Sequence, residues 1–300
     1  SNTMNRDLVT SRPAFVRLVL ALLLLAVRAI PAGAIVPLTA PPLPERVALA
    51  DLIALGKVTA IEDDLVEAAP LVMIPGVTNK VSYRIAVASI QSSLLGAEKV
   101  ERVRVAFAPP SVDGAKPGRG TGRFALVRLA AGDEGCFFLR KHADEPFYVA
   151  AASYDFVDKK TTKEFDNGVG QVKRCVRLLG DPCAGLQSKQ ADDRLLTAAL
   201  LIYRYRTPRF VYQGKPKMEP IEAEQSQRIV AALVEGDWST KEGPAPGSPL
   251  SLFLRLGLTK ADGWEPPAAL PEVAPAARKW LQNHRDYRIR RYVAPEESGK

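Results

Sequence analysis

The spacing of apolar residues changes once along this chain, near residue 160. Between residues 50 and 156, apolar side chains come in short runs or at every second position, as they do in β-strands. From about residue 166 onward they recur every three or four residues, which is typical of amphipathic helices. The sequence therefore predicts an α+β fold, with a strand-rich first half and a mainly helical second half.

Five or six short strands are predicted in the first half. The first covers residues 51–61, and the second alternates over residues 83–90 before a Leu95-Gly96 turn. Shorter strands are predicted at residues 103–107, 124–129, 136–140 and 147–151. Strands this apolar would aggregate at an open rim, so we predict a small closed barrel. The alternative is an open sandwich whose edge is covered by a terminal strand at residues 287–293.

The second half carries several helical segments. Apolar residues between Val169 and Leu179 fall on one helical face, and Gly180 ends that segment. Further helices are predicted at residues 186–206, from Pro220 onward, at 249–256 and at 272–284. The chain then returns to alternation, which predicts a short strand at its end.

The first 34 residues have the layout of a cleavable export signal. Arg12 and Arg17 precede an apolar run at residues 18–27, and Ala32-Gly33-Ala34 supplies a small-x-small cleavage site. The run is shorter than the roughly 20 apolar residues that span a bilayer. We predict a mature protein that begins at Ile35 and works in the periplasm or outside the cell. The alternative is a short, uncleaved membrane anchor.

This layout predicts three segments: a signal peptide at residues 1–34, a barrel domain at 35–157 and a helical domain at 158–300. Cleavage lowers the formal net charge from +8 to +5, because four arginines and one aspartate are removed. That charge is too modest to predict a nucleic-acid partner. The abundance of Ala, Arg and Pro suggests a GC-rich bacterial genome. We expect a protein or an anionic envelope polymer as partner, and no membrane span after cleavage.

Three segments of the strand-rich half carry a family resemblance. They are residues 50–58, residues 83–90 leading to Leu95-Gly96, and residues 103–105. In these segments, about 100 residues in extent, the chain resembles the netrin-like, or tissue-inhibitor-of-metalloproteinase-like, version of the OB-fold barrel. The resemblance implies an OB-like barrel of five to six strands. Inhibitory members of that family place an N-terminal cysteine at a protease metal. The predicted mature protein begins with Ile35 and not with a cysteine, so the resemblance does not imply protease inhibition.

If the protein is exported, its three cysteines lie in an oxidising environment, where disulfides can form. Cys175 and Cys183 flank a Gly-Asp-Pro turn, and we predict a disulfide between them. Cys136 lies in an apolar strand and is interpreted as a small buried residue. Three scattered cysteines and two histidines have no metal-ligand spacing, so neither a metal site nor a cofactor is predicted.

His142 is the catalytic candidate, since it lies in a turn that also carries cations and carboxylates. It has no evident nucleophile partner in the sequence, so we prefer to interpret it as part of a polar hairpin tip. His284 ends a basic helix, and we interpret it as a cap of the carbonyl end.

The one basic cluster lies near the end of the chain. Its candidate binding residues are Arg285, Arg288, Arg290 and Arg291. They are candidates for contact with an anionic envelope polymer, phospholipid head groups or an acidic partner. The alternative, which the alternation of the segment favours, is a solvated strand face with Tyr287 and Ile289 packed inward.

Two classes of function remain open. The first, which we favour, is an exported, non-enzymatic binding or interaction protein of the bacterial cell envelope. The second is an envelope hydrolase with an unrecognised site near the groove between the two halves. The sequence lacks the His-Glu-x-x-His, Gly-x-Ser-x-Gly, Ser-x-x-Lys and Cys-x-x-Cys motifs of common exported enzymes.

Cleavage after Ala34 is directly testable. N-terminal sequencing or the intact mass of exported protein should place Ile35 first, because signal peptidase cuts after a small-x-small site. A mature protein that still carries residues 18–27 would contradict this prediction and favour the membrane anchor.

Overall fold

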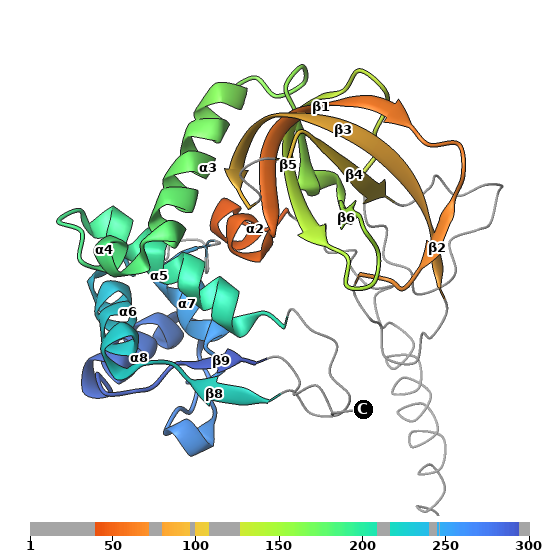
Figure 1. The fold of residues 1–300 in the computed structure, drawn as a ribbon. Coiled ribbons are helices and arrows are strands. Elements are labelled where there is room, and N and C mark those ends of the chain that lie inside the picture. The colour runs from red at the N-terminus through yellow and green to blue at the C-terminus, as the bar shows by residue number, and fades with distance from the viewer. Residues whose placement is uncertain are drawn as a thin grey trace, which may run out of the picture. The chain divides into compact units, whose positions relative to one another are not determined.

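The computed structural model describes residues 40–71, 80–96, 100–107, 127–208, 217–239, 245 and 247–293. These residues form a mixed α+β structure, as the change of apolar spacing predicts (Figure 1). The predicted export signal, including the apolar run at residues 18–27, lies outside the described residues. Within the described residues, no helix combines the length and apolar character needed to cross a bilayer.

Seven strands make up the main sheet. They are β1 (Leu52–Ile61), β2 (Val66–Ala68), β3 (Val81–Leu95), β4 (Arg102–Phe107), β5 (Glu134–Lys141), β6 (Tyr148–Val149) and β7 (Phe156–Asp158). β1 pairs with β3 on one side and with β5 on the other, so its strand has two neighbours. The pairings β3–β4, β4–β6 and β6–β5 complete a continuous cycle, in which only β4 and β6 run parallel.

Both faces of β5 and of the first half of β1 are largely buried, which explains why these segments are apolar runs. Leu52 and Ala54 of β1 join Phe137 of β5 in a cluster of buried residues that belong mainly to the strands. The alternate residues, Ile53 and Phe138, belong instead to a second cluster shared with the helices. Because successive side chains point to opposite faces, one strand supplies two cores.

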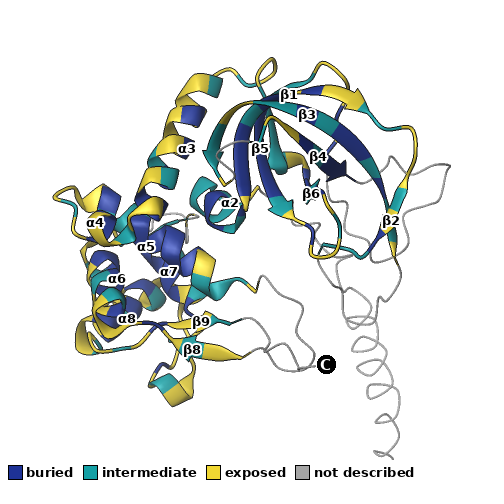
Figure 2. Ribbon diagram, in the orientation of Figure 1, coloured by how far each residue is buried: buried dark blue, intermediate teal, exposed yellow. Residues whose placement is uncertain are grey.

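The helices are α2 (Leu43–Leu49), α3 (Phe165–Gly180), α4 (Pro182–Leu186), α5 (Ala191–Arg206), α6 (Ala223–Glu235), α7 (Pro249–Arg255) and α8 (Leu270–Asn283). Two short 3-10 helices are η1 (Ser153–Asp155) and η2 (Lys260–Asp262). α5 is the most deeply buried of them, and its residues from Thr197 to Tyr203 are all buried (Figure 2). The shared cluster therefore forms around α5.

α2 connects the sheet to the helices through two adjacent charged side chains. Glu45 forms an ion pair with Arg255 of α7. Arg46 donates to the backbone carbonyl of Tyr154, and its guanidinium lies 4.0 Å from the centre of the Phe138 ring. The pKa of Arg46 is lowered, mainly because burial removes water from its charge. α2 thus contacts both parts of the structure within two residues.

Several sequence-predicted elements differ from the structure. β2, β7 and α2 were not predicted, since each is short or lies in a segment rich in Pro and Ala. Of the strand predicted at residues 124–129, residues 127–129 are irregular, and residues 124–126 lie outside the described residues. The terminal strand exists as β9 (Arg290–Tyr292), but it pairs with β8 (Met218–Pro220) and does not cover the main sheet.

Alanine substitutions at two glycines should change the stability of the protein in opposite directions, because Gly135 packs tightly between β5 and β7 and Gly170 has open space around it. A Cβ at Gly135 would lie 2.2 Å from the Val157 carbonyl oxygen, so Gly135→Ala should lower the free energy of unfolding by about 1–3 kcal/mol. Gly170 lies inside α3 with open space around it, so Gly170→Ala should raise that free energy by about 0.5–1 kcal/mol. Chemical denaturation of both variants checks the pair, and equal stabilities would contradict the described β5–β7 packing.

Candidate functional site

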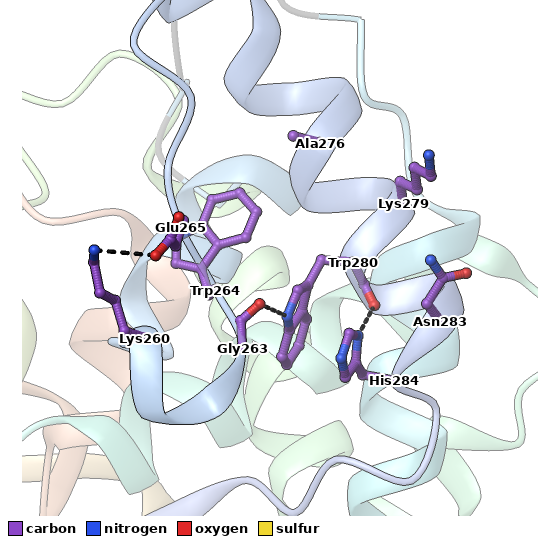
Figure 3. Close-up of a pocket in the computed structure, with 9 residues that line it drawn as sticks. All are labelled: Lys260, Gly263, Trp264, Glu265, Ala276, Lys279, Trp280, Asn283 and His284. Carbon is purple, nitrogen blue, oxygen red and sulfur yellow. Dashed lines mark hydrogen bonds and ion pairs between the residues drawn. The ribbon is translucent and has the colours of Figure 1, made fainter.

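The candidate site is an open groove of about 500 Å³ between η2 and α8 (Figure 3). Its lining residues are Lys260, Gly263, Trp264, Glu265, Ala276, Lys279, Trp280, Asn283 and His284. The volume lies within the range of small-molecule binding sites. On α8, the lining residues are spaced by three and four positions, so a single helical face forms one wall of the groove.

A tight turn after η2 builds the opposite wall. Asp262 caps η2 by accepting hydrogen bonds from the Thr259 backbone N–H and hydroxyl, at 3.0 and 2.9 Å. Gly263 then adopts a left-handed conformation with φ of 73°, which a residue with a side chain rarely adopts. The turn directs the Gly263 carbonyl at α8, where it accepts a hydrogen bond of 3.1 Å from the Trp280 indole N–H.

Aromatic rings form the floor of the groove. Phe253 of α7 packs edge-on against both Trp264 and Trp280, with ring centres 4.8 and 5.9 Å away. His284 stacks on Trp280 with ring centres 4.3 Å apart and ring planes 11° apart. Both tryptophans are largely buried, so packing fixes the small part of each ring that lines the groove.

The hydrogen bonds of His284 leave one ring nitrogen available. Nδ1 lies 2.8 Å from the Trp280 carbonyl oxygen, which can only accept, so these partners assign the proton to Nδ1. This bond caps the end of α8, as the sequence predicted for His284. Nε2 has no hydrogen-bond partner among the described residues, and Figure 3 shows the ring beside the Trp280 indole.

The rim of the groove carries two lysines in different situations. Lys260 forms an exposed ion pair of 3.0 Å with Glu265. Lys279 is exposed and forms no ion pair or hydrogen bond with any other described residue. Exposed ion pairs contribute little to stability, so the side chains of the rim can rearrange toward a ligand. The groove therefore combines a fixed aromatic floor with a cationic rim.

Two further cavities lie elsewhere. One, of about 580 Å³, is formed by α6 and the turn after α8, and Arg285 and Asp286 line it. The other, of about 60 Å³, lies among α2, β5 and η1 and includes Arg46, Arg140 and Asp155. Burial raises the pKa of Asp155, although two backbone N–H groups donate to its carboxylate. This second space holds a few water molecules at most, so a polymer chain does not fit there.

His142 lies in the turn between the antiparallel strands β5 and β6, the polar hairpin interpreted from the sequence, and its side chain is buried there. It is 3 % exposed. Nδ1 accepts hydrogen bonds of 3.1 Å from the backbone N–H groups of Asp144 and Glu145. Nε2, which then carries the proton, lies 2.9 Å from the Ala69 carbonyl oxygen. Both ring nitrogens are used, and no nucleophile lies among these partners.

The four candidate arginines near the end of the chain are not gathered into one site. Arg288 donates to the Ile221 carbonyl, and Arg290 forms an ion pair of 3.3 Å with Asp262. Arg285 lines the cavity beside α6, while Arg291 is exposed on β9. The inward packing expected of the alternating segment is confirmed, since Ile289 is fully buried and Tyr287 is half-buried.

All three cysteines are free thiols, so the disulfide predicted between Cys175 and Cys183 is not formed in the structure. Cys175 faces the core on the buried side of α3, and burial raises its pKa to about 11. Cys183 lies in α4 and is exposed. Cys136 is buried in β5, as predicted from its apolar strand.

The described residues form no candidate metal site, because no three His, Cys, Asp or Glu side chains among them lie close enough together to hold a metal ion. The chain matches no protein-family model and no curated protein. The groove itself was not predicted from the sequence, because its two walls come from segments that are separate in the chain. The spacing of Ala276, Lys279 and Asn283 along α8 was a signal for it, but Trp264 comes from a separate segment.

The buried contacts of His142 predict a stability defect for its removal. His142→Ala leaves two N–H groups and one carbonyl without partners, and should lower the free energy of unfolding by about 1–3 kcal/mol. His142→Asn should lower the free energy of unfolding less than His142→Ala does, since an Asn side-chain oxygen can still accept hydrogen bonds from backbone N–H groups two or three residues further along the turn. Denaturant unfolding of both variants tests this order; two variants as stable as the wild type would show that these contacts do not stabilise the turn.

Proposed function

We propose that this protein is an exported, non-enzymatic binding protein of the bacterial cell envelope. The observation that carries the proposal is the groove between η2 and α8. It joins a rigid aromatic floor to cationic and amide side chains that have no internal role. Such a combination suits recognition, because packing fixes the site before a ligand arrives and the polar rim gives specificity.

We also propose that the strands form a closed barrel of OB type, with the netrin-like arrangement that the sequence resembles. The cycle of pairings from β1 through β3, β4, β6 and β5 back to β1 supports this proposal. Closure removes the rims at which apolar strands would aggregate. In this proposal the barrel is the scaffold, and the helical part carries the binding groove.

Export is part of the same proposal and rests on the sequence of residues 12–34. The partner would then be a component of the envelope, either a protein or an anionic polymer. The alternative, an envelope hydrolase, requires a base beside a nucleophile. Both nitrogens of His142 are bonded to the backbone, and the stacked ring of His284 lies among side chains without a hydroxyl nucleophile. These contacts favour binding over hydrolysis.

The binding role is tested by co-sedimentation of the purified protein with isolated bacterial envelopes. Lys279→Glu combined with Asn283→Ala changes two exposed groove residues and should reduce the sedimented fraction about fivefold or more. The matched control combines Gln171→Ala with Lys173→Glu on the exposed face of α3, and should sediment like the wild type. Equal sedimentation of the groove variant and the wild type would contradict the proposed site.

A further inference from the structure

We infer that the groove between η2 and α8 binds a carboxylate-bearing sugar unit of an acidic polysaccharide. This inference rests on the proposed binding function and names its ligand. It combines three properties of the groove: its apolar surface, its hydrogen-bonding groups and its charge. Each property excludes a different class of ligand.

The apolar surface suits a ring of saturated carbons. Trp264 and Trp280 line the groove together with Ala276, which lies one turn from Trp280 on α8 (Figure 3). A sugar ring has C–H groups that pack against aromatic surfaces, whereas a bare inorganic anion has no apolar surface to bury. Because the groove is open to solvent, it can accept an inner unit of a longer chain.

The polar groups suit neighbouring hydroxyls. Asn283 supplies both a donor and an acceptor, and the carboxylate of Glu265 supplies an acceptor. A sugar hydroxyl can donate and accept, so it can satisfy either residue. A purely aliphatic ligand would displace water from both side chains without replacing its hydrogen bonds, which would cost binding free energy.

The charge of the groove favours a carboxylate on that sugar. Lys260 is neutralised by Glu265, but the charge of Lys279 has no counterpart among the described residues that line the groove. With its proton on Nδ1, His284 can accept a hydrogen bond from a sugar hydroxyl at the free Nε2. A hydrogen bond from the Lys279 ammonium to a carboxylate is charge-assisted and therefore stronger than a neutral one. A carboxylate beside Lys279 would therefore complete the site.

This assignment places anion recognition at Lys279 and not at the arginines that were candidates in the sequence. Arg288 and Arg290 already bind the Ile221 carbonyl and Asp262. Their charges are engaged by the fold, so they compete poorly for an external anion. Lys279 is not engaged and lies next to the aromatic floor, where charge and apolar contact can act on one ligand.

Tryptophan fluorescence gives a direct test, since two of the three tryptophans line the groove. The wild type is titrated with trimers of galacturonate, mannuronate and glucuronate, and with their methyl esters, which keep the sugar and remove the charge. At least one acidic trimer should change the fluorescence saturably, and its methyl ester should bind about tenfold more weakly. Lys279→Glu should weaken binding of the acidic trimer about tenfold, and Lys173→Glu should leave it unchanged.

The other outcomes separate this inference from the proposed function. Equal affinity for the acidic trimer and its methyl ester would overturn the assignment of a carboxylate. If none of the three acidic trimers binds but the groove variant still loses its co-sedimentation with envelopes, the assignment of an acidic sugar is overturned and the proposed binding function stands. Failure of that co-sedimentation experiment as well would overturn both.

Discussion

The structure depends on the way α2 places Glu45 and Arg46 between the strands and the helices. Glu45 binds Arg255 of α7, and the guanidinium of Arg46 lies over the Phe138 ring and donates to the Tyr154 carbonyl. An arginine in this position loses water, and the aromatic face and the carbonyl compensate for part of that loss. Replacement of Arg46 would remove both contacts from β5 and η1, while leaving the Glu45 contact with α7 in place.

The same region explains why strands and helices share one core. β1 and β5 send alternate side chains into the space between the strands and toward α2 and α5. A strand with two buried faces is stable only when both faces are covered, so the helices complete the burial that the strands begin. The predicted boundary between residues 157 and 158 falls inside β7, and Ile53 and Phe138 share a buried cluster with residues of the helices beyond it.

The fold was more predictable from the sequence than the groove. The strand at residues 51–61 was predicted from a long apolar run, and the helix around Val172 from a regular helical period. Short elements such as α2 and β7 gave no period, and tertiary packing determines them. The burial of His142 was not predicted, because the sequence shows its polar neighbours but not the carbonyl of Ala69, which is distant in the chain. The groove was missed for the same reason, since Trp264 and Trp280 come to line one groove only when the turn at Gly263 packs against α8.

The hydrogen bond from Trp280 to the Gly263 carbonyl also has a thermodynamic consequence. It fixes the turn after η2 against α8 before any ligand is present, and the stack of His284 on Trp280 fixes the neighbouring ring. A ligand that binds in this groove loses translational and rotational entropy, but no further entropy is lost in ordering the aromatic side chains. Association should then resemble docking onto a rigid surface, with heat released by contact formation and only the rim side chains losing rotamers.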